Sequence, residues 1–255
     1  MPATTDGLRF DAGKLPSPSP CPHCGAVRAV RTVEVAGRPL FAGFEPCGCP
    51  AAAEERARWE ADRARAARFA EESAWERKLE RAGILPRYRE ASHPWAPKMA
   101  AMAMEGQGFY LHGGNGTGKT TLACAAALIC LRKGLDVRFA VATKLLDELR
   151  DFGDAQRRQL AAMAKCDLLV VDDLGKEGAA TPRAAEKLFD LFNDRYNNQT
   201  LVTPRPVVVT SNFPRGDVAA RVSEGGAGMA VASRLKEMCR AVEMDGEDWR
   251  LNGQG

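Results

Sequence analysis

Two different patterns of hydrophobic and polar positions divide this chain. Residues 51–82 are rich in Ala, Glu and Arg and lack Gly and Pro, which predicts one long helix with charges of both signs on its surface. From about residue 105 onward, short apolar runs alternate with longer helical segments. This alternation predicts an α/β fold with a parallel sheet and right-handed crossovers.

Five apolar runs after residue 105 are the expected strands of that sheet. The run at 168–171, Leu-Leu-Val-Val, is continuous, which is typical of a strand covered on both faces. Helices are expected between the strands, and Pro182 fits the first turn of the last of them. The predicted strands are 108–112, 137–142, 168–171, 207–210 and 241–244, and the predicted helices are about 120–133, 144–152 and 182–196.

The first eighty residues are organised differently from the sheet region. Residues 1–20 end in Pro-Ser-Pro-Ser-Pro, which forms neither a helix nor a central strand, so we expect a disordered tail. Residues 21–50 hold four cysteines with a β-like run between them, 51–82 form a linker helix, and 83–255 form the α/β domain. A partner-binding role is the alternative for the helix.

Composition and charge exclude several classes of protein. With 255 residues, 45% of them hydrophobic and 27% charged, the chain has enough apolar material for a core, which excludes wholesale disorder. A net charge of +3 argues against coating nucleic acid by bulk electrostatics. The first twenty residues lack the apolar block of a secretory signal, and the longest apolar stretch, 122–131, is about half a membrane span. We therefore expect a soluble, cytoplasmic protein without membrane contact.

A glycine-rich segment after the first expected strand carries the strongest chemical signal. Residues 113–120, Gly-Gly-Asn-Gly-Thr-Gly-Lys-Thr, match the phosphate-binding pattern GxxxxGK[ST], with the required strand before it and helix after it. Glycines let backbone N–H groups converge on phosphate oxygens, and the helix N-terminus adds partial positive charge. Lys119 is expected to reach the β- and γ-phosphates of ATP, and the Thr120 hydroxyl to bind Mg²⁺. The nucleotide-binding candidates are Gly113, Asn115, Gly116, Thr117, Gly118, Lys119, Thr120 and Thr121.

Polar residues at the ends of two later strands are the candidates for catalysis. Asp172 and Asp173 end the buried 168–171 run, and we assign Asp172 to the Mg²⁺ site and Asp173 to orienting or deprotonating the attacking water. Asn212 follows the 207–210 strand, where ligands bind in parallel sheets, and is a candidate for positioning that water. By position alone, the Asp pair and Asn212 also fit ordinary turns.

The motifs taken together resemble one family. In this order, GGNGTGKTTLACA, LLVVDDLG, VVVTSN and VASRL are similar to the AAA+ ATPases of the DnaC/IstB group, which comprises bacterial replicative helicase loaders and the ATP-binding helpers of transposases. Residues 82–92 resemble the segment that helps enclose the adenine in that group, and residues 246–250 resemble its C-terminal signature. The resemblance covers roughly residues 80–252 and implies an AAA+ P-loop ATPase with a parallel five-stranded sheet.

The resemblance also implies roles for single residues. Asn212 matches sensor 1 of the family, and Arg234, in Ser-Arg-Leu, matches the arginine finger that acts on the ATP of a neighbouring subunit. Arg221 is then the less favoured finger, and by composition alone each arginine also fits a solvated helix face. Where the general AAA+ pattern has Asp-Glu, this chain has Asp172-Asp173, so the second carboxylate is one methylene shorter. We expect slow or partner-stimulated hydrolysis from this change, and homo-oligomers on ATP binding.

Four cysteines before residue 50 have the spacing of a metal site. Cys21, Cys24, Cys47 and Cys49 form CxxC…CxC, and four thiolates at this spacing suit tetrahedral Zn²⁺, which would fold a segment too small for its own core. Unliganded cysteines or an iron–sulfur cluster are the alternatives, and His23 is expected beside the metal or in solvent. The other cysteines have apolar neighbours and are expected in the core: Cys124, Cys130, Cys166 and Cys239.

The first functional hypothesis is an ATP-dependent helicase loader that binds the replicative DNA helicase through residues 1–80 and controls single-stranded DNA binding. Some helicase loaders resemble this chain in carrying an N-terminal zinc module. The candidates for DNA contact, for which composition alone favours a solvated helix face, are Lys144, Arg150, Arg157, Arg158 and Lys165. The second hypothesis is an IstB-like transposase helper ATPase acting on double-stranded DNA. A small-molecule kinase and a zinc-dependent binding module with a nucleotide-sensing switch are the others.

Overall fold

The structure, a computed structural model, describes residues 15–149, 153–176, 181–200, 202–223 and 226–246. It contains two compact units, residues 1–73 and 74–255, and each is described by itself below. Of the residues singled out in the sequence, Arg150 and residues 247–250 lie outside the described part. Among the described residues, no helix combines the length and the apolar character needed to cross a membrane.

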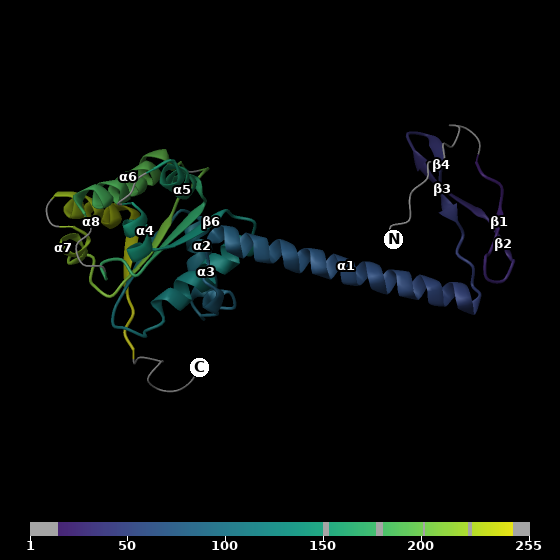
Figure 1. Cartoon of the computed structure of the whole chain (residues 1–255), viewed down its shortest axis with the longest axis horizontal. Coiled ribbons are helices and arrows are strands. Elements are labelled where there is room, and N and C mark those ends of the chain that lie inside the picture. The colour runs from purple at the N-terminus through teal and green to yellow at the C-terminus, as the bar shows by residue number, and fades with distance from the viewer. Residues whose placement is uncertain (1–14, 150–152, 177–180, 201, 224–225, 247–255) are drawn as a thin grey trace. The chain divides into compact units, whose positions relative to one another are not determined.

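Two short antiparallel strand pairs precede a long helix in the first unit (Figure 1). β1 (Ser19–Pro20) pairs with β2 (Val27–Arg28), and β3 (Val30–Val35) pairs with β4 (Arg38–Phe44). Ala36 and Gly37 join β3 to β4 with φ values of 52° and 72°, the left-handed conformation of a tight hairpin turn. β1 consists of the last two residues of the segment expected as a tail, so that expectation does not hold for Ser19 and Pro20. Proline is tolerated in an edge strand although it lacks an N–H group.

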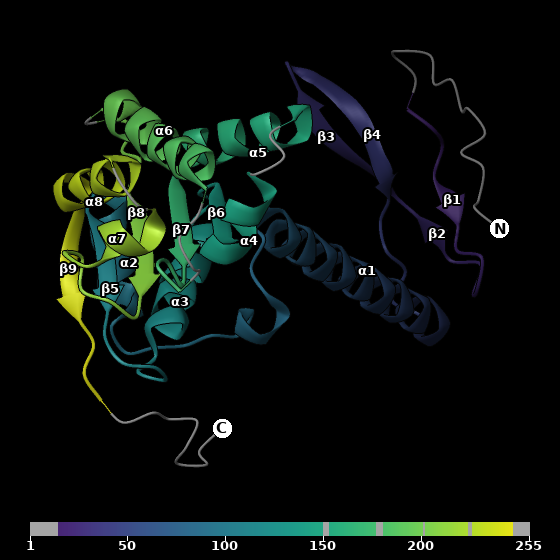
Figure 2. The ribbon, with the colours of Figure 1, turned by 60° about the vertical axis from the view of Figure 1, so that its left-hand side comes forward.

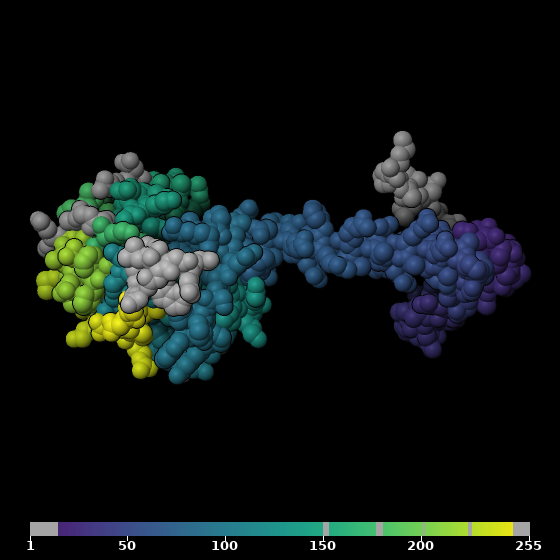
Figure 3. Space-filling view, turned by 90° about the horizontal axis from the view of Figure 1, so that it is seen from below, coloured from purple at the N-terminus to yellow at the C-terminus, as the bar shows by residue number. Residues whose placement is uncertain are grey.

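A single helix, α1 (Pro50–Ala82), follows the cysteine segment and continues into the second unit. All residues from 57 to 72 are exposed, and the space-filling view shows them as part of the blue stretch of the chain (Figure 3). This stretch includes Phe69, whose exposure is 72%. The buried positions of α1 are Ala52 at one end and Leu79 and Ala82 at the other. Tertiary packing therefore holds this helix only near its two ends.

A five-stranded parallel sheet organises the second unit, which confirms the predicted fold class. The strand order is β6-β7-β8-β5-β9, so β8 lies between the strand that carries Asp172 and the strand that leads into the phosphate loop. All five residues of both β7 and β8 are buried, as their continuous apolar runs predict. The strands are β5 (Gly108–His112), β6 (Val137–Val141), β7 (Leu168–Asp172), β8 (Val207–Ser211) and β9 (Cys239–Glu243).

Helices cover both faces of the sheet, and each face has its own apolar core (Figure 2). The end of α1 packs on one face with α2 (Ala96–Met104) and α3 (Lys119–Arg132). The other face carries α4 (Ala142–Glu148), α5 (Asp154–Lys165), α6 (Pro182–Asn198), α7 (Val218–Val222) and α8 (Gly226–Met238). The helices α2, α5, α7 and α8 are not among those predicted. The buried residues of α2 have helical spacing (Ala96, Met99, Ala100 and Ala103), but its exposed positions include alanine too, so composition alone does not separate the two faces.

One fully buried arginine fixes the connections beneath the site. Arg195 of α6 donates hydrogen bonds to the carbonyl oxygens of Met163 (2.6 Å), Cys166 (2.9 Å) and Pro206 (2.8 Å). These acceptors lie at the end of α5, before β7 and before β8, so one guanidinium bonds to carbonyl groups of three separate segments. The start points of β7 and β8, which carry the polar residues of the site at their other ends, are thereby held together.

Candidate functional site

The phosphate loop connects β5 to α3 through backbone that glycine adopts easily. Gly113, Gly116 and Gly118 have φ values of 141°, 74° and 84°. A Cβ atom at Gly113 would lie 2.2 Å from the carbonyl oxygen of Met244, so no larger residue fits there. The loop therefore has the left-handed geometry that turns successive N–H groups toward one anion site, directly before the N-terminus of α3.

The side chain of Lys119 lies over this loop with 5% exposure. Its Nζ atom donates to the carbonyl oxygens of Gly113 (2.9 Å) and Gly114 (2.5 Å), and the Thr117 hydroxyl donates to Gly114 (3.1 Å). The positive charge of Lys119 therefore lies at the place where phosphate oxygens would bind. Asn115 is exposed at the tip of the loop. This donor set suits the triphosphate of ATP.

A buried carboxylate completes the centre of the site. The hydroxyl groups of Thr120 and Thr210 both donate to Oδ1 of Asp172, at 2.8 Å and 2.6 Å. Asp172 is 2% exposed, and burial raises the pKa of its carboxyl group, although the two hydroxyl donors oppose this rise. An oxygen donor and a desolvated carboxylate in contact suit Mg²⁺, so the pair expected from the sequence lies together.

Asp173 has a strained backbone next to this carboxylate. Its φ of 60° is uncommon for a residue other than glycine. The Asp173 N–H donates to the Thr210 hydroxyl (2.9 Å), and its carboxylate pairs with the Nζ atom of Lys176 (3.2 Å). Strain of this kind persists only where neighbouring contacts hold it, and here the contacts are those with Thr210 and Lys176.

The end of β8 carries the other candidate for positioning water. Asn212 directly follows β8 and is half-buried. Its position is fixed by the two neighbours, because the Ser211 hydroxyl donates to the carbonyl oxygen of Leu174 (2.6 Å) and accepts from the Phe213 N–H (3.1 Å). Since β8 lies between β7 and β5, Asn212 emerges at the same sheet edge as Asp172 and the phosphate loop.

The two finger candidates are held within their own chain. Arg234 of α8 donates to Glu237 and Asn193, each at 2.8 Å, and lies 4.2 Å from the ring centre of Tyr196. The guanidinium of Arg221 stacks 3.5 Å from the ring centre of Phe213. To reach the ATP of another subunit, Arg234 would have to leave its contacts with α6.

Sequence reasoning missed two contributors to this site. Thr210 is fully buried and bonds both to Asp172 and to the Asp173 N–H, and a hydroxyl within the apolar run of β8 was the available signal. Arg87 precedes α2 in a short 3₁₀ helix (Pro86–Tyr88), and its charge makes a small contribution that lowers the pKa of Asp172 against the larger effect of burial. The family resemblance places residues 82–92 beside the adenine but does not single out Arg87, and no local pattern connects it with a residue 85 positions later.

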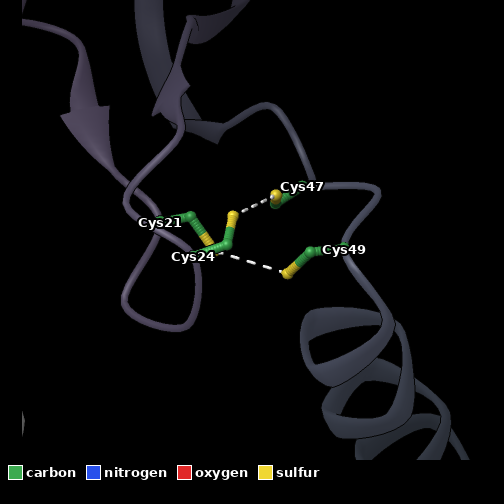
Figure 4. Close-up of side chains that lie close together, drawn as sticks. All are labelled: Cys21, Cys24, Cys47 and Cys49. Carbon is green, nitrogen blue, oxygen red and sulfur yellow. Dashed lines mark hydrogen bonds between the residues drawn. The ribbon is translucent and has the colours of Figure 1, made fainter.

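In the first unit, the four cysteines expected as metal ligands lie together (Figure 4). The Sγ atoms of Cys21 and Cys49 are 3.9 Å apart, those of Cys24 and Cys47 are 3.5 Å apart, and all four lie within 4.8 Å of one another. Sulfur atoms bound tetrahedrally to zinc at about 2.3 Å would be about 3.8 Å apart. The spacing therefore suits Zn²⁺ and is far longer than a disulfide bond of about 2.0 Å.

The protonation chemistry of this donor set also suits a cation. Hydrogen bonds from the backbone N–H groups of His23 and Cys24 lower the pKa of Cys21 to about 6. At Cys24 the Ala26 N–H favours the thiolate, but the thiols of Cys47 and Cys49 outweigh it and raise the pKa to about 12. The Cys21 thiolate thus forms more readily than that of Cys24, and a bound divalent cation would stabilise both as thiolates. The other four cysteines are buried, as the sequence predicts.

Replacing Asp172 tests the cost of its buried charge. Because burial raises its pKa, the stabilisation from the protonated form is present at low pH and lost as pH rises through that pKa, so the carboxylate weakens the fold at pH 7. Asp172→Asn keeps the acceptor for both hydroxyls and removes the charge. We expect a higher unfolding temperature without nucleotide, by about 2–4 °C for each kcal/mol gained.

Thermal unfolding of the full chain between about pH 5 and pH 8 measures this effect. The gain in Asp172→Asn should shrink as pH falls, and stabilisation by ATP with Mg²⁺ should disappear. Asp62→Asn, an exposed carboxylate of α1, is the control and should change neither quantity. A variant less stable than the natural protein at pH 8 would contradict the argument.

Metal content tests the cysteine cluster. Protein purified without chelator should carry about one equivalent of zinc, and replacing Cys24 and Cys47 together with serine should remove it. Elemental analysis combined with thiol titration gives both numbers. Less than about half an equivalent, with four reactive thiols at these positions, would contradict a four-cysteine zinc site.

Comparison with known proteins shows to which protein family this chain belongs. The sequence profile described as IstB-like ATP binding protein matches residues 99–254, more than half of this chain. An ATP-binding protein in an insertion sequence of Mycobacterium tuberculosis is 29% identical over 148 residues, which cover 57% of this chain and 56% of the relative. The insertion sequence IS5376 ATP-binding protein of Geobacillus stearothermophilus is 27% identical over 138 residues, covering 53% and 52%. The chain thus spans about half the length of the curated relatives it matches.

Structural similarity agrees with this result at the level of the fold. A crystal structure of DnaI matches 60% of this chain and 80% of its own chain, with a TM-score of 0.50 and 23% sequence identity. The second unit thus shares its fold with this structure. Because the profile match spans the region that carries the phosphate loop, Asp172 and Asn212, this chain belongs to the family of IstB-like ATP binding proteins.

Proposed function

We propose that this protein is a helper ATPase of a transposase, which binds and hydrolyses ATP and assists the transposase at its DNA. The observation that carries the proposal is the Thr120–Asp172–Thr210 arrangement beside the phosphate loop, in a chain whose curated relatives are ATP-binding proteins of insertion sequences. These relatives favour the transposase helper, the second hypothesis drawn from the sequence, over the helicase loader that the cysteine module first favoured.

The proposed chemistry assigns one task to each residue of the site. Bound ATP with Mg²⁺ supplies the phosphoryl group and a cation that neutralises its developing charge. Lys119 and the N–H groups of residues 113–118 hold the phosphate oxygens, while Thr120 and Asp172 hold the cation. Asp173 accepts the proton of the attacking water at its carboxylate, and Asn212 orients that water.

One contact supports slow or partner-stimulated turnover. The Asp173 carboxylate pairs with Lys176 at 3.2 Å, and its side chain is one methylene shorter than the glutamate of the general AAA+ pattern. A base that is short and already paired has to be released and moved before it can act. Binding of a partner or a second subunit would provide that movement.

A second candidate function, the helicase loader, is favoured by the cysteine module. Residues 21–49 lie outside the region matched by the family profile, which begins at residue 99. A separate module with four clustered thiols supplies a docking element that an ATPase domain alone lacks, and zinc modules at this position resemble those of some loaders. In this alternative the module binds the replicative DNA helicase and the ATPase domain contacts single-stranded DNA.

DNA contact is proposed for one exposed group of basic side chains. Among the described residues, Lys144, Arg157, Arg158 and Lys165 are exposed on α4 and α5. Arg157 also pairs weakly with Asp154 at 3.5 Å, so part of its charge is already balanced. Both hypotheses include DNA binding, with double-stranded DNA for the transposase helper and single-stranded DNA for the helicase loader. The test therefore compares the two forms of DNA.

A binding experiment with two partners separates the hypotheses. Size-exclusion chromatography with light scattering is carried out on the full chain mixed with the transposase nearest its gene or with the replicative helicase of its source. Each mixture is measured with ATP, with ADP and without nucleotide. We expect an ATP-dependent complex with the transposase and stimulation of turnover by double-stranded DNA.

Two lysine variants control this experiment. Lys119→Ala should abolish turnover and the ATP dependence of the complex, whereas Lys133→Ala, an exposed lysine just after the other end of α3, should change neither. A complex with the helicase alone, with turnover stimulated by single-stranded DNA, would replace the transposase hypothesis with the loader.

Arg234 is proposed as the finger that acts on ATP in a neighbouring subunit. Arg234→Ala should leave the Kd for a fluorescent ATP analogue within about twofold while lowering assembly-dependent turnover by at least about 10³-fold. Steady-state ATPase rates at increasing protein concentration measure this. Normal rates in Arg234→Ala would refute the assignment.

Arg221→Ala is the matched comparison, because Arg221 also stacks on an aromatic ring of its own chain. Its turnover should remain close to that of the natural protein. Thermal unfolding of both variants is measured in parallel, since Arg234 also bonds to Asn193. A loss in turnover that follows the loss in stability would mark Arg234 as a structural residue.

A further inference from the structure

The cysteine cluster is built from two segments, and the second leads directly into α1. Cys21 and Cys24 lie in the loop between β1 and β2, whereas Cys47 and Cys49 lie in the segment after β4 (Figure 4). Pro50, the first residue of α1, follows Cys49 without a linker. Any change in the position of Cys49 is therefore transmitted to the first turn of the helix.

Three contacts tie the beginning of α1 to both cysteine segments. The Arg56 guanidinium donates to the carbonyl oxygen of Cys47 (2.7 Å), and the Ala53 N–H donates to that of Cys49 (3.0 Å). The Glu55 carboxylate contacts Nε2 of His23, between the first two cysteines, at 2.6 Å. Arg56 is half-buried, and Ala52 one turn earlier is 8% exposed, so this face of the helix packs on the module.

The first turns of α1 have few stabilising features of their own. The helix begins with Pro-Ala-Ala-Ala, and its first turn contains no acidic side chain to balance the partial positive charge of the N-terminus. The next stretch, residues 57–72, is exposed throughout and offers no tertiary packing. The contacts with the module are therefore the tertiary packing at this end of the helix, and a helix end that loses such packing frays readily in water.

We propose that residues 50–56 are part of the metal site, so that metal binding and formation of the first two turns of α1 are one coupled event. Arg56 is the positioning residue: by holding the Cys47 carbonyl it fixes the Cys47-Gly-Cys49 segment in the geometry that brings both thiols to the cluster. A thiolate at Cys49 in turn places negative charge at the positive end of the helix. This inference rests on the zinc site proposed above.

The coupling gives the module a consequence beyond its own folding. Without metal, the cysteine segments lose their cross-connection, and the contacts that hold residues 50–56 in a helix disappear with it. The metal thus determines where the ordered part of α1 begins. A partner that binds the module would contact a segment whose connection to α1 depends on the metal.

Zinc release and hydrogen exchange on the full zinc-loaded chain test this coupling. Arg56→Ala should weaken zinc binding by about 10-fold or more, measured by competition with a chromogenic chelator, because it removes a contact that orients a ligand. Arg58→Ala is the matched control, since Arg58 lies on the same helix, is exposed and undergoes the same change in side chain. It should behave like the natural protein, and Arg56→Lys, which retains a donor, should recover part of the affinity.

Hydrogen exchange provides the second readout. Chelation of zinc from the natural protein should speed amide exchange in peptides covering residues 51–58 and leave residues 74–82, which include positions buried in the second unit, unchanged. Equal zinc affinity in Arg56→Ala and Arg58→Ala, or unchanged exchange at 51–58, would overturn the coupling while the zinc site stands. Failure of the natural protein to take up zinc would overturn the zinc site and the inference with it.

Discussion

A single buried carboxylate sets the conditions that the fold of the second unit has to meet. Asp172 is almost fully removed from water, so its oxygen atoms need donors supplied by the protein. Thr120 at the start of α3 and Thr210 near the end of β8 provide them, and the same Thr210 hydroxyl also accepts the N–H of Asp173. Three elements that are distant in sequence therefore have to meet at one point. The strand order, with β8 between β7 and β5, is what allows this.

Close backbone approach is the second constraint on the site. The carbonyl oxygen of Met244 lies where a Cβ atom of residue 113 would be, and the Met244 N–H donates to the carbonyl oxygen of His112 at 2.7 Å. The end of the last strand thus fixes the start of the phosphate loop from the side. Glycine at position 113 is required both by its φ value and by this neighbour, two separate physical reasons for the same residue.

The first unit meets a different physical problem, which is the lack of a core. The strand pair β3–β4 leaves Val33, Val35 and Leu40 about half exposed, so apolar burial contributes little to its stability. A metal bound by four thiolates would replace that missing contribution with a few strong bonds. Arg56 and Glu55, near the start of α1, contact the two cysteine segments that would hold this metal. Metal binding would stabilise the first unit, whereas burial of apolar side chains stabilises the second.

The sequence by itself determined the parallel sheet, the phosphate loop and the clustering of four cysteines, because periodicity and short motifs are local properties of the chain. Strand positions agree within one or two residues for that reason, since a short continuous apolar run such as Leu168–Val171 is typical of a strand covered on both faces. Only the tertiary structure decided that Thr210 bonds to Asp172, that Arg87 lies near it and that Arg195 bonds to carbonyls before β7 and β8. These contacts join residues 11 to 85 positions apart. Thr210, Arg87 and Arg195 are ordinary polar residues in the sequence, and no local pattern distinguishes them from solvated ones. Helix α2 was not predicted although its buried residues have helical spacing, because alanine occupies both buried and exposed positions in it.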